Sequence, residues 1–239
     1  MTCGPDRVSA RLSAIDVRTG VVRWTWRDST SVASRRLALK ANVAARGRVF
    51  LLGAMEIGSW QRVQGIIVEL GRMTGRERRR FATPDSSSDY RAATFDGRHR
   101  LVVVNSQGSG IEAFDLDAWD LAWRVRGTGG WADPTAPPAV LDGVAYSGWH
   151  TQDVVAVDIE TGRQLWKRAV RGDIWSVTAC KNEVVAQHFA LPWVDRRTGK
   201  VRASDPFEES SEYPFTDLVT DGERVYAMSD SRFYAYRCE

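Results

Sequence analysis

A pattern of eleven residues recurs along this chain and constrains its fold more than any other feature. AIDVRTGVVRW at 14–24 and AVDIETGRQLW at 156–166 carry Ala, Asp, Thr-Gly and Trp at the same offsets. Weaker copies are AFDLDAWDLAW at 113–123, WVDRRTGKVRA at 193–203, ELGRMTGRERR at 69–79 and the final fragment FYAYRCE. The copies begin at 14, 69, 113, 156, 193 and 235, so most spacings fall near the length of one four-stranded propeller blade.

Each copy has the chemistry of a β-hairpin. LSAID and VVAVD alternate their side chains as strands do, and the glycine of Thr-Gly can adopt the positive φ that the reversal needs. An aspartate at the end of a strand can accept hydrogen bonds from N–H groups of the turn. We therefore interpret the repeated aspartates as turn caps rather than catalytic carboxylates.

Upstream of each hairpin, a turn with Gly or Asn precedes another β-rich stretch, as in FDGRHRLVVVN and TDGERVYAMS. Four strands per repeat and no helical pattern predict an all-β fold, a β-propeller of four-stranded antiparallel blades. The N-terminal part supplies the last two strands of a blade and the C-terminal part supplies three, with four complete blades between them. We thus expect about 21 strands in five to six blades, with incomplete terminal blades, in a single domain that spans residues 1–239.

The pattern Ala-x-Asp-x-x-Thr-Gly-x-x-x-Trp resembles the tryptophan-docking motif of quinoprotein-like β-propellers, the pyrroloquinoline-quinone repeat family. The resemblance implies that the motif tryptophans pack between neighbouring blades. It also implies a bacterial periplasmic or envelope setting, or the sensor part of a larger signalling protein. The residues to which it gives a structural role are Asp16, Gly20, Trp24, Asp115, Trp123, Asp158, Gly162, Trp166, Asp195 and Gly199.

The quinone enzymes that carry this repeat have an adjacent-cysteine disulfide, a calcium site and a catalytic aspartate. This chain has no Cys-Cys pair, and no acidic and amide cluster stands out as a calcium site. The histidines His99, His150 and His188 have no metal-type spacing, and neither a G-x-S-x-G sequence nor a phosphate-binding glycine loop is present. We therefore expect no enzyme activity, no cofactor and no metal.

Loops from every blade of a propeller gather around the central channel, on the face opposite the Thr-Gly turns. The aromatic and histidine residues of these loops are Trp60, Tyr90, Trp131, Trp149, His150, Trp175 and Tyr213. Loop aromatics have less core to fill, and Tyr and Trp often anchor binding surfaces. We predict a non-catalytic scaffold that binds a protein or peptide partner through this face. For part of the set, packing over the channel mouth is the alternative.

The alternative function is a carbohydrate-binding or glycan-cleaving propeller with a site at the central channel. Two facing carboxylates would be its mark, and the candidate acidic residues near the loops are Glu56, Asp133, Asp153, Asp173 and Glu208. With 33 basic and 30 acidic residues, the net charge of +3 does not favour nucleic-acid binding. No apolar run approaches the roughly 20 residues of a transmembrane helix.

The N-terminal sequence and the cysteines leave the compartment open. MTCGPDRVSARL lacks the apolar stretch of an intact signal peptide, so the location is cytoplasmic, or else periplasmic or envelope if a leader was removed. Cys3 stands where the lipidated cysteine of a trimmed lipoprotein could lie, although no lipobox precedes it. Cys3 and Cys238 flank the two ends, where they could pair as a disulfide in a closed ring or remain free thiols.

Overall fold

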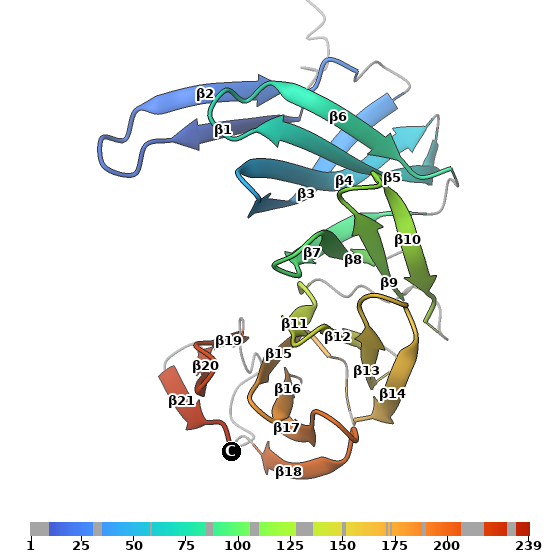
Figure 1. Ribbon diagram of the computed structural model, residues 1–239, viewed down its shortest axis with the longest axis vertical. Helices are drawn as coiled ribbons and strands as arrows, with labels where there is room; N and C mark the ends of the chain where they lie inside the picture. The colour runs from blue at the N-terminus through green and yellow to red at the C-terminus, as the bar shows by residue number, and fades with distance from the viewer. Residues whose placement is uncertain are drawn as a thin grey trace, which may run out of the picture. The chain divides into compact units, whose positions relative to one another are not determined.

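Within the residues that the structure describes, every regular element is a β-strand. The computed structural model describes residues 10–30, 35–57, 59–84, 88–105, 110–127, 136–149, 152–170, 172, 174–187, 190–206, 218–228 and 233–239. None of these residues belongs to a helix of the length and apolarity that crossing a membrane requires. The strands form antiparallel sheets (Figure 1), and the chain divides into two compact units, residues 1–90 and residues 91–239.

In the first unit, the part of the chain that the structure describes forms a hairpin and one complete four-stranded sheet. The hairpin pairs β1 (Arg11–Ile15) with β2 (Val22–Arg27). The sheet has the order β3 (Arg35–Ala45), β4 (Arg48–Ile57), β5 (Ser59–Gly71), β6 (Glu77–Ala82). Its two inner strands are rich in Leu, Ile and Val, whose side chains bury on both faces and build a core with Trp26 of β2.

The described residues of the second unit form three four-stranded sheets and one three-stranded sheet. The first comprises β7 (Tyr90–Phe95), which begins at the boundary, then β8 (Arg100–Asn105), β9 (Gly110–Asp115) and β10 (Asp120–Val125). The second comprises β11 (Ala139–Leu141), β12 (Val144–Trp149), β13 (Asp153–Asp158) and β14 (Gln164–Ala169). The third comprises β15 (Ser176–Cys180), β16 (Glu183–Gln187), β17 (Ala190–Asp195) and β18 (Val201–Pro206). The last comprises β19 (Leu218–Thr220), β20 (Arg224–Met228) and β21 (Phe233–Arg237).

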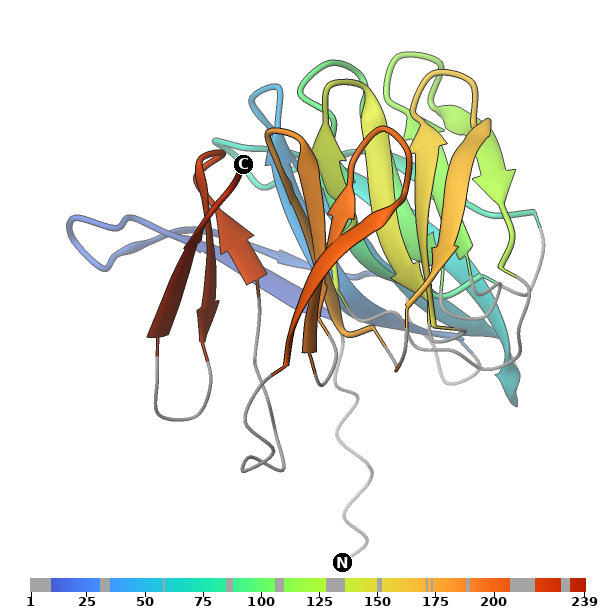
Figure 2. The ribbon, with the colours of Figure 1, turned by 90° about the horizontal axis from the view of Figure 1, so that it is seen from below.

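The sheets of the second unit stand side by side, with the tight turns between their third and fourth strands together at one end (Figure 2). Each pair of neighbouring sheets encloses its own apolar cluster, to which the inner strands contribute buried Val, Ala, Leu and Ile side chains. The fourth strands β10 and β14 are more exposed. The core is therefore a row of sheet-to-sheet interfaces, as expected for blades that bury their faces against one another.

These sheets confirm the predicted fold class, a β-propeller of four-stranded antiparallel blades. The described strands also include the two-stranded N-terminal hairpin and the three-stranded C-terminal sheet that the repeat spacing predicts. That the chain acts as one domain over residues 1–239 stays a prediction.

One expectation about the cysteines is wrong. Cys238 bonds to Cys180, which is 58 residues away in the sequence, so it is neither a free thiol nor paired with Cys3. Cys180 ends β15 and Cys238 follows β21, and both sulfur atoms lie in the apolar cluster between these two sheets. Contact between neighbouring sheets sets the pairing, and nearness of the two chain ends does not.

Candidate functional site

The repeated aspartates lie at tight turns and accept hydrogen bonds there. Asp195 Oδ1 accepts bonds from the Thr198 N–H and the Thr198 hydroxyl, both at 2.8 Å. The Thr198 hydroxyl bond is the largest of the causes that lower the pKa of Asp195 to about 2, followed by the Thr198 N–H and then Arg202. Asp158 makes the same two bonds to Thr161, and its pKa is also lowered. A carboxylate held ionised in this way is suited to capping a turn and unsuited to donating a proton.

The motif tryptophans contact the turn of the next sheet. The indole N–H of Trp123 donates to the carbonyl of Ile159 at 2.6 Å, and that of Trp166 donates to the carbonyl of Arg196 at 2.8 Å. Within the first unit, Trp24 donates to the carbonyl of Arg72 at 2.8 Å.

Each of these three indoles lies directly against a turn glycine. A Cβ atom added to Gly75, Gly162 or Gly199 would stand 2.5, 2.6 or 2.8 Å from an indole carbon. The Thr-Gly turn therefore serves two purposes: the glycine reverses the chain at positive φ and also leaves room for the neighbouring tryptophan. Gly75 belongs to the copy that retains little more than Thr-Gly, and that segment alone gives no sign of the tryptophan that packs on it.

The copy at 193–203 exchanges the two residues that face each other across its hairpin. In the copies at 14–24, 113–123 and 156–166 an alanine on one strand pairs with the tryptophan on the next, as Ala156 does with Trp166. In this copy Trp193 pairs with Ala203. Trp193 packs edge to face on Tyr236 of β21, with ring centroids 5.7 Å apart. The indole thus contacts the next sheet from the third strand, β17, and not from the fourth strand, β18.

The aromatic residues predicted to form a binding face are not brought together among the described residues. Tyr90 and Trp149 are buried, because they extend β7 and β12 rather than standing in loops, and no partner could reach them without unfolding. Trp175 is half-buried, and its main-chain N–H donates to the carbonyl of Gln187. The side chain of Trp60, which lies in β5, and the residues Trp131, His150 and Tyr213 lie outside the described residues.

An open apolar groove of about 410 Å³ lies in the first unit, beside the β1–β2 hairpin. Three of its apolar side chains are unusually exposed: Ile15 by 58%, Val17 by 98% and Met73 by 69%. The other lining residues are Ala14, Asp16, Arg18, Arg23, Trp24, Val49 and Arg72. Arg23 forms an ion pair with Asp16, which leaves the guanidinium groups of Arg18 and Arg72 as excess positive charge beside the groove. Sequence reasoning missed this surface because it treated VRTGVV only as a turn.

The acidic residues proposed for a glycan site give that alternative no support. Asp153 is 2.8 Å from the Lys167 ammonium group, and Glu56 is partly buried in β4. Asp133, Asp173 and Glu208 lie outside the described residues. The buried carboxylates Glu69 and Glu112 pair with arginines of their own sheets.

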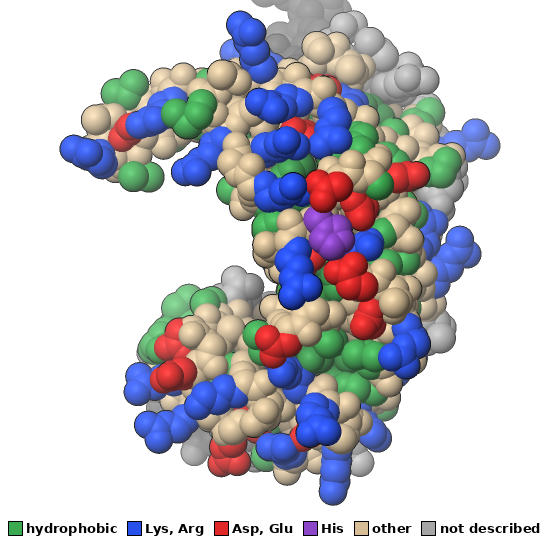
Figure 3. Space-filling model, viewed as in Figure 1, with side chains coloured by type: hydrophobic (Ala, Val, Ile, Leu, Met, Phe, Trp, Pro, Cys, Tyr) green, Lys and Arg blue, Asp and Glu red, His purple; other side chains and the backbone are tan. Residues whose placement is uncertain are grey.

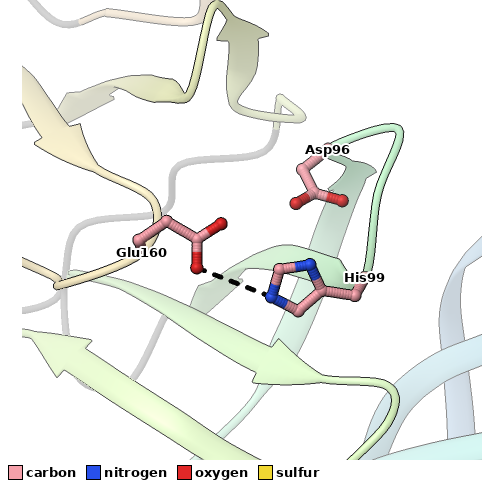
Figure 4. A group of neighbouring side chains, drawn as sticks. All are labelled: Asp96, His99 and Glu160. Carbon is pink, nitrogen blue, oxygen red and sulfur yellow. Dashed lines mark ion pairs between the residues drawn. The ribbon is translucent and has the colours of Figure 1, made fainter.

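Three side chains of types that bind metal ions lie close together: Asp96, His99 and Glu160 (Figure 4). One donor atom of each lies within 4.8 Å of the others, and His99 Nε2 is 3.5 Å from Glu160 Oε2. An imidazole and two carboxylates are a donor set that zinc accepts. However, Arg100 Nη2 is 3.2 Å from the same oxygen of Glu160, so this carboxylate already has a cationic partner. The group is an ion-pair network between the β7–β8 and β13–β14 turns, on a face where acidic and basic side chains surround a histidine (Figure 3).

A family model described as "Outer membrane protein assembly factor BamB" matches residues 107–237 of this chain. A search of curated protein sequences finds no match.

Solved structures with the same fold cover most of the chain. BamB from Moraxella catarrhalis has a TM-score of 0.58 and 15% identity, over 95% of this chain and 79% of that chain. The computationally designed Ika8 protein has a TM-score of 0.62 and 16% identity, over 84% of this chain and 71% of that chain. The computationally designed Ika4 protein has a TM-score of 0.55 and 19% identity, over 65% of this chain and 95% of that chain. At these identities the similarity concerns the fold.

Proposed function

This chain belongs to the pyrroloquinoline-quinone-repeat β-propeller family described as outer membrane protein assembly factor BamB, and from this premise we propose that it is a non-catalytic scaffold that binds a protein partner. The family description names assembly factors, which supports protein interaction as the general role. The turn-capping bonds of Asp158 and Asp195 also support a role without catalysis, since they use these carboxylates for structure.

The observation that carries the proposal is the apolar groove beside the β1–β2 hairpin. This groove of about 410 Å³ is lined by the exposed apolar side chains of Ile15, Val17 and Met73. Exposed apolar side chains gathered in this way are typical of a surface that a partner covers. Arg18 and Arg72 stand at the same groove and favour a negatively charged partner. We propose that the groove binds an extended segment of a partner protein that carries apolar and acidic side chains.

Affinity capture with matched variants tests this function. The tagged protein is incubated with a lysate of its native organism, and recovered proteins are compared between wild type and a Val17→Asp, Met73→Glu double variant. Val219→Asp is the control, because Val219 is also an exposed apolar residue but lies on β19, in the other unit. We expect a partner that wild type and Val219→Asp recover and that the double variant loses. Circular dichroism confirms that all three proteins are folded.

Recovery of every partner by the double variant would contradict binding at the groove. The loop face predicted from the sequence is then tested in the same assay with a Trp131→Ala, Trp175→Ala variant. Loss of the partner in this second variant alone would move the binding surface to the loops and keep the scaffold function. Equal recovery by all variants would contradict both surfaces.

A further inference from the structure

The last sheet-to-sheet contact of the second unit differs from the others in its chemistry. Trp123 and Trp166 each donate an indole N–H to a carbonyl in the turn of the following sheet. The next motif, at 193–203, has Ala203 at the tryptophan position, on β18. Trp193, on the opposite strand, supplies a ring contact to Tyr236. The contact between β15–β18 and β19–β21 therefore lacks a tryptophan on its fourth strand.

Cys238 occupies the position that accepts the indole in the sheets β11–β14 and β15–β18. The acceptor Ile159 is the first residue after the third strand β13, and the acceptor Arg196 is the first residue after the third strand β17. Cys238 is likewise the first residue after β21, the third strand of its sheet. The backbone hydrogen bonds agree with this alignment. The N–H of Ile159 donates to the carbonyl of Gly143, at the turn that joins the first two strands of its sheet.

The same backbone bond recurs in the next two sheets. The N–H of Arg196 donates to the carbonyl of Asn182, and that of Cys238 donates to the carbonyl of Glu223. These acceptors lie in the β15–β16 and β19–β20 turns. Ile159, Arg196 and Cys238 are therefore equivalent residues of three successive sheets.

At this contact a covalent bond reaches the residue that is equivalent to the indole acceptors Ile159 and Arg196, and it comes from the first strand of the preceding sheet rather than from the fourth. Cys180 ends β15, the first strand of its sheet, and bonds to Cys238 in the following sheet. Both cysteines are buried in a cluster with Trp193, Leu218 and Val225. Next to the bond, the N–H of Glu239 donates to Glu183 Oε2 at 3.1 Å.

We infer that the Cys180–Cys238 disulfide is a redox-cleavable staple that takes the place of the docking tryptophan and holds the sheet β19–β21 against β15–β18. A dithiol reductant cleaves it in two steps. One thiolate of the reductant attacks a cystine sulfur to give a mixed disulfide, and the second thiol then displaces it. Cys180 and Cys238 leave as two thiols, and the reductant becomes a disulfide, so two electrons pass from the reductant to the protein. Because both sulfur atoms are buried, the attack requires the sheets to separate locally first.

Hydrogen exchange of the full chain, followed by mass spectrometry, tests the staple. Rates are compared for the oxidised protein, for the protein reduced with dithiothreitol, and for a Cys180→Ala, Cys238→Ala double variant. We expect amides of β19–β21 to exchange about 10- to 100-fold faster in the last two samples, because the unfolded states of this sheet are no longer constrained. The amides of β11–β14 should keep their rates, which also shows that the variant is folded. Cys3→Ala, which keeps the staple, should exchange as the wild type does.

Two results would overturn the inference. Unchanged exchange in β19–β21 after reduction and in the double variant would show that apolar contacts hold the sheet by themselves. An equal acceleration in β11–β14 and β19–β21 would show that the disulfide stabilises the unit as a whole and has no particular role at this contact.

Discussion

Single glycines at the Thr-Gly turns couple chain reversal to the packing of a neighbouring tryptophan. Gly162 and Gly20 have the same φ of 71°, but only Gly162 lies against an indole; around Gly20 an added Cβ would meet nothing within 4 Å. Alanine variants at these two glycines therefore distinguish the strain of a left-handed backbone from steric overlap with an indole.

Gly20→Ala should lower the free energy of unfolding by about 1–2 kcal/mol, from the left-handed conformation alone. Gly162→Ala should lower it by about 1–3 kcal/mol more, because the new methyl group displaces the indole of Trp123. Urea denaturation of both variants measures the difference. Equal losses would mean that the indole can shift without loss of stability.

The turn cap at Asp195 predicts a dependence of stability on pH. Its pKa in the folded chain is about 2, below the ordinary 3.8, so the unfolded chain takes up the proton more readily. The contribution of this cap is therefore complete above pH 3.8 and is lost as the pH falls toward 2. We expect the melting temperature of Asp195→Asn to fall less steeply over this interval than that of the wild type. Thermal denaturation measures both proteins. Melting temperatures that fall with pH equally steeply in both would contradict stabilisation by this turn cap.

The docking tryptophans act at the level of whole sheets. Trp123→Ala should destabilise the contact between β7–β10 and β11–β14 by about 2–4 kcal/mol, since a large partly buried ring is removed. Trp123→Phe keeps an aromatic ring but loses the bond to the Ile159 carbonyl, and should lose about 1 kcal/mol. Urea denaturation checks both values. If the Phe variant is as unstable as the Ala variant, the whole loss of stability comes from the hydrogen bond and none from packing of the ring.

The strands and sheets followed from the sequence because their signals are local. Alternating side chains and the Thr-Gly turn fix each hairpin within about a dozen residues. Other features depend on which side chain the next sheet presents, and no local pattern predicts this. They are the Cys180–Cys238 bond and the exchange of Trp193 with Ala203. The sequence predicts Tyr90 and Trp149 as loop residues because alternation does not mark where a strand ends, whereas both belong to strands and are buried.

The candidate site was less predictable than the fold. The groove gathers Val17 of the first hairpin with Met73 of a turn that lies more than 50 residues further along the chain. Each is an ordinary apolar residue in its own segment, and only the packing of the hairpin beside the sheet makes them one surface. The aromatic loop face remains a prediction for Trp60, Trp131, His150, Trp175 and Tyr213.

At the scale of the whole molecule, the sequence predicts one domain, and contacts divide the chain at residue 90. We expect the units to unfold together, because both consist of the same repeat and only a short connection separates β6 from β7. Pulsed hydrogen exchange across a urea gradient gives separate curves for peptides of β4 and β16. Coincident midpoints would support one domain, and clearly separated midpoints would establish two.

The acceptor of each docking indole is a main-chain oxygen, which every amino acid possesses. Ile159 has an apolar side chain and Arg72 and Arg196 have charged ones, yet each presents this atom to a tryptophan. Substitutions at these positions can therefore accumulate after a repeat is duplicated without removing the acceptor. A cysteine could arise at such a position before its partner did, and the covalent bond could evolve at a junction that was already in place.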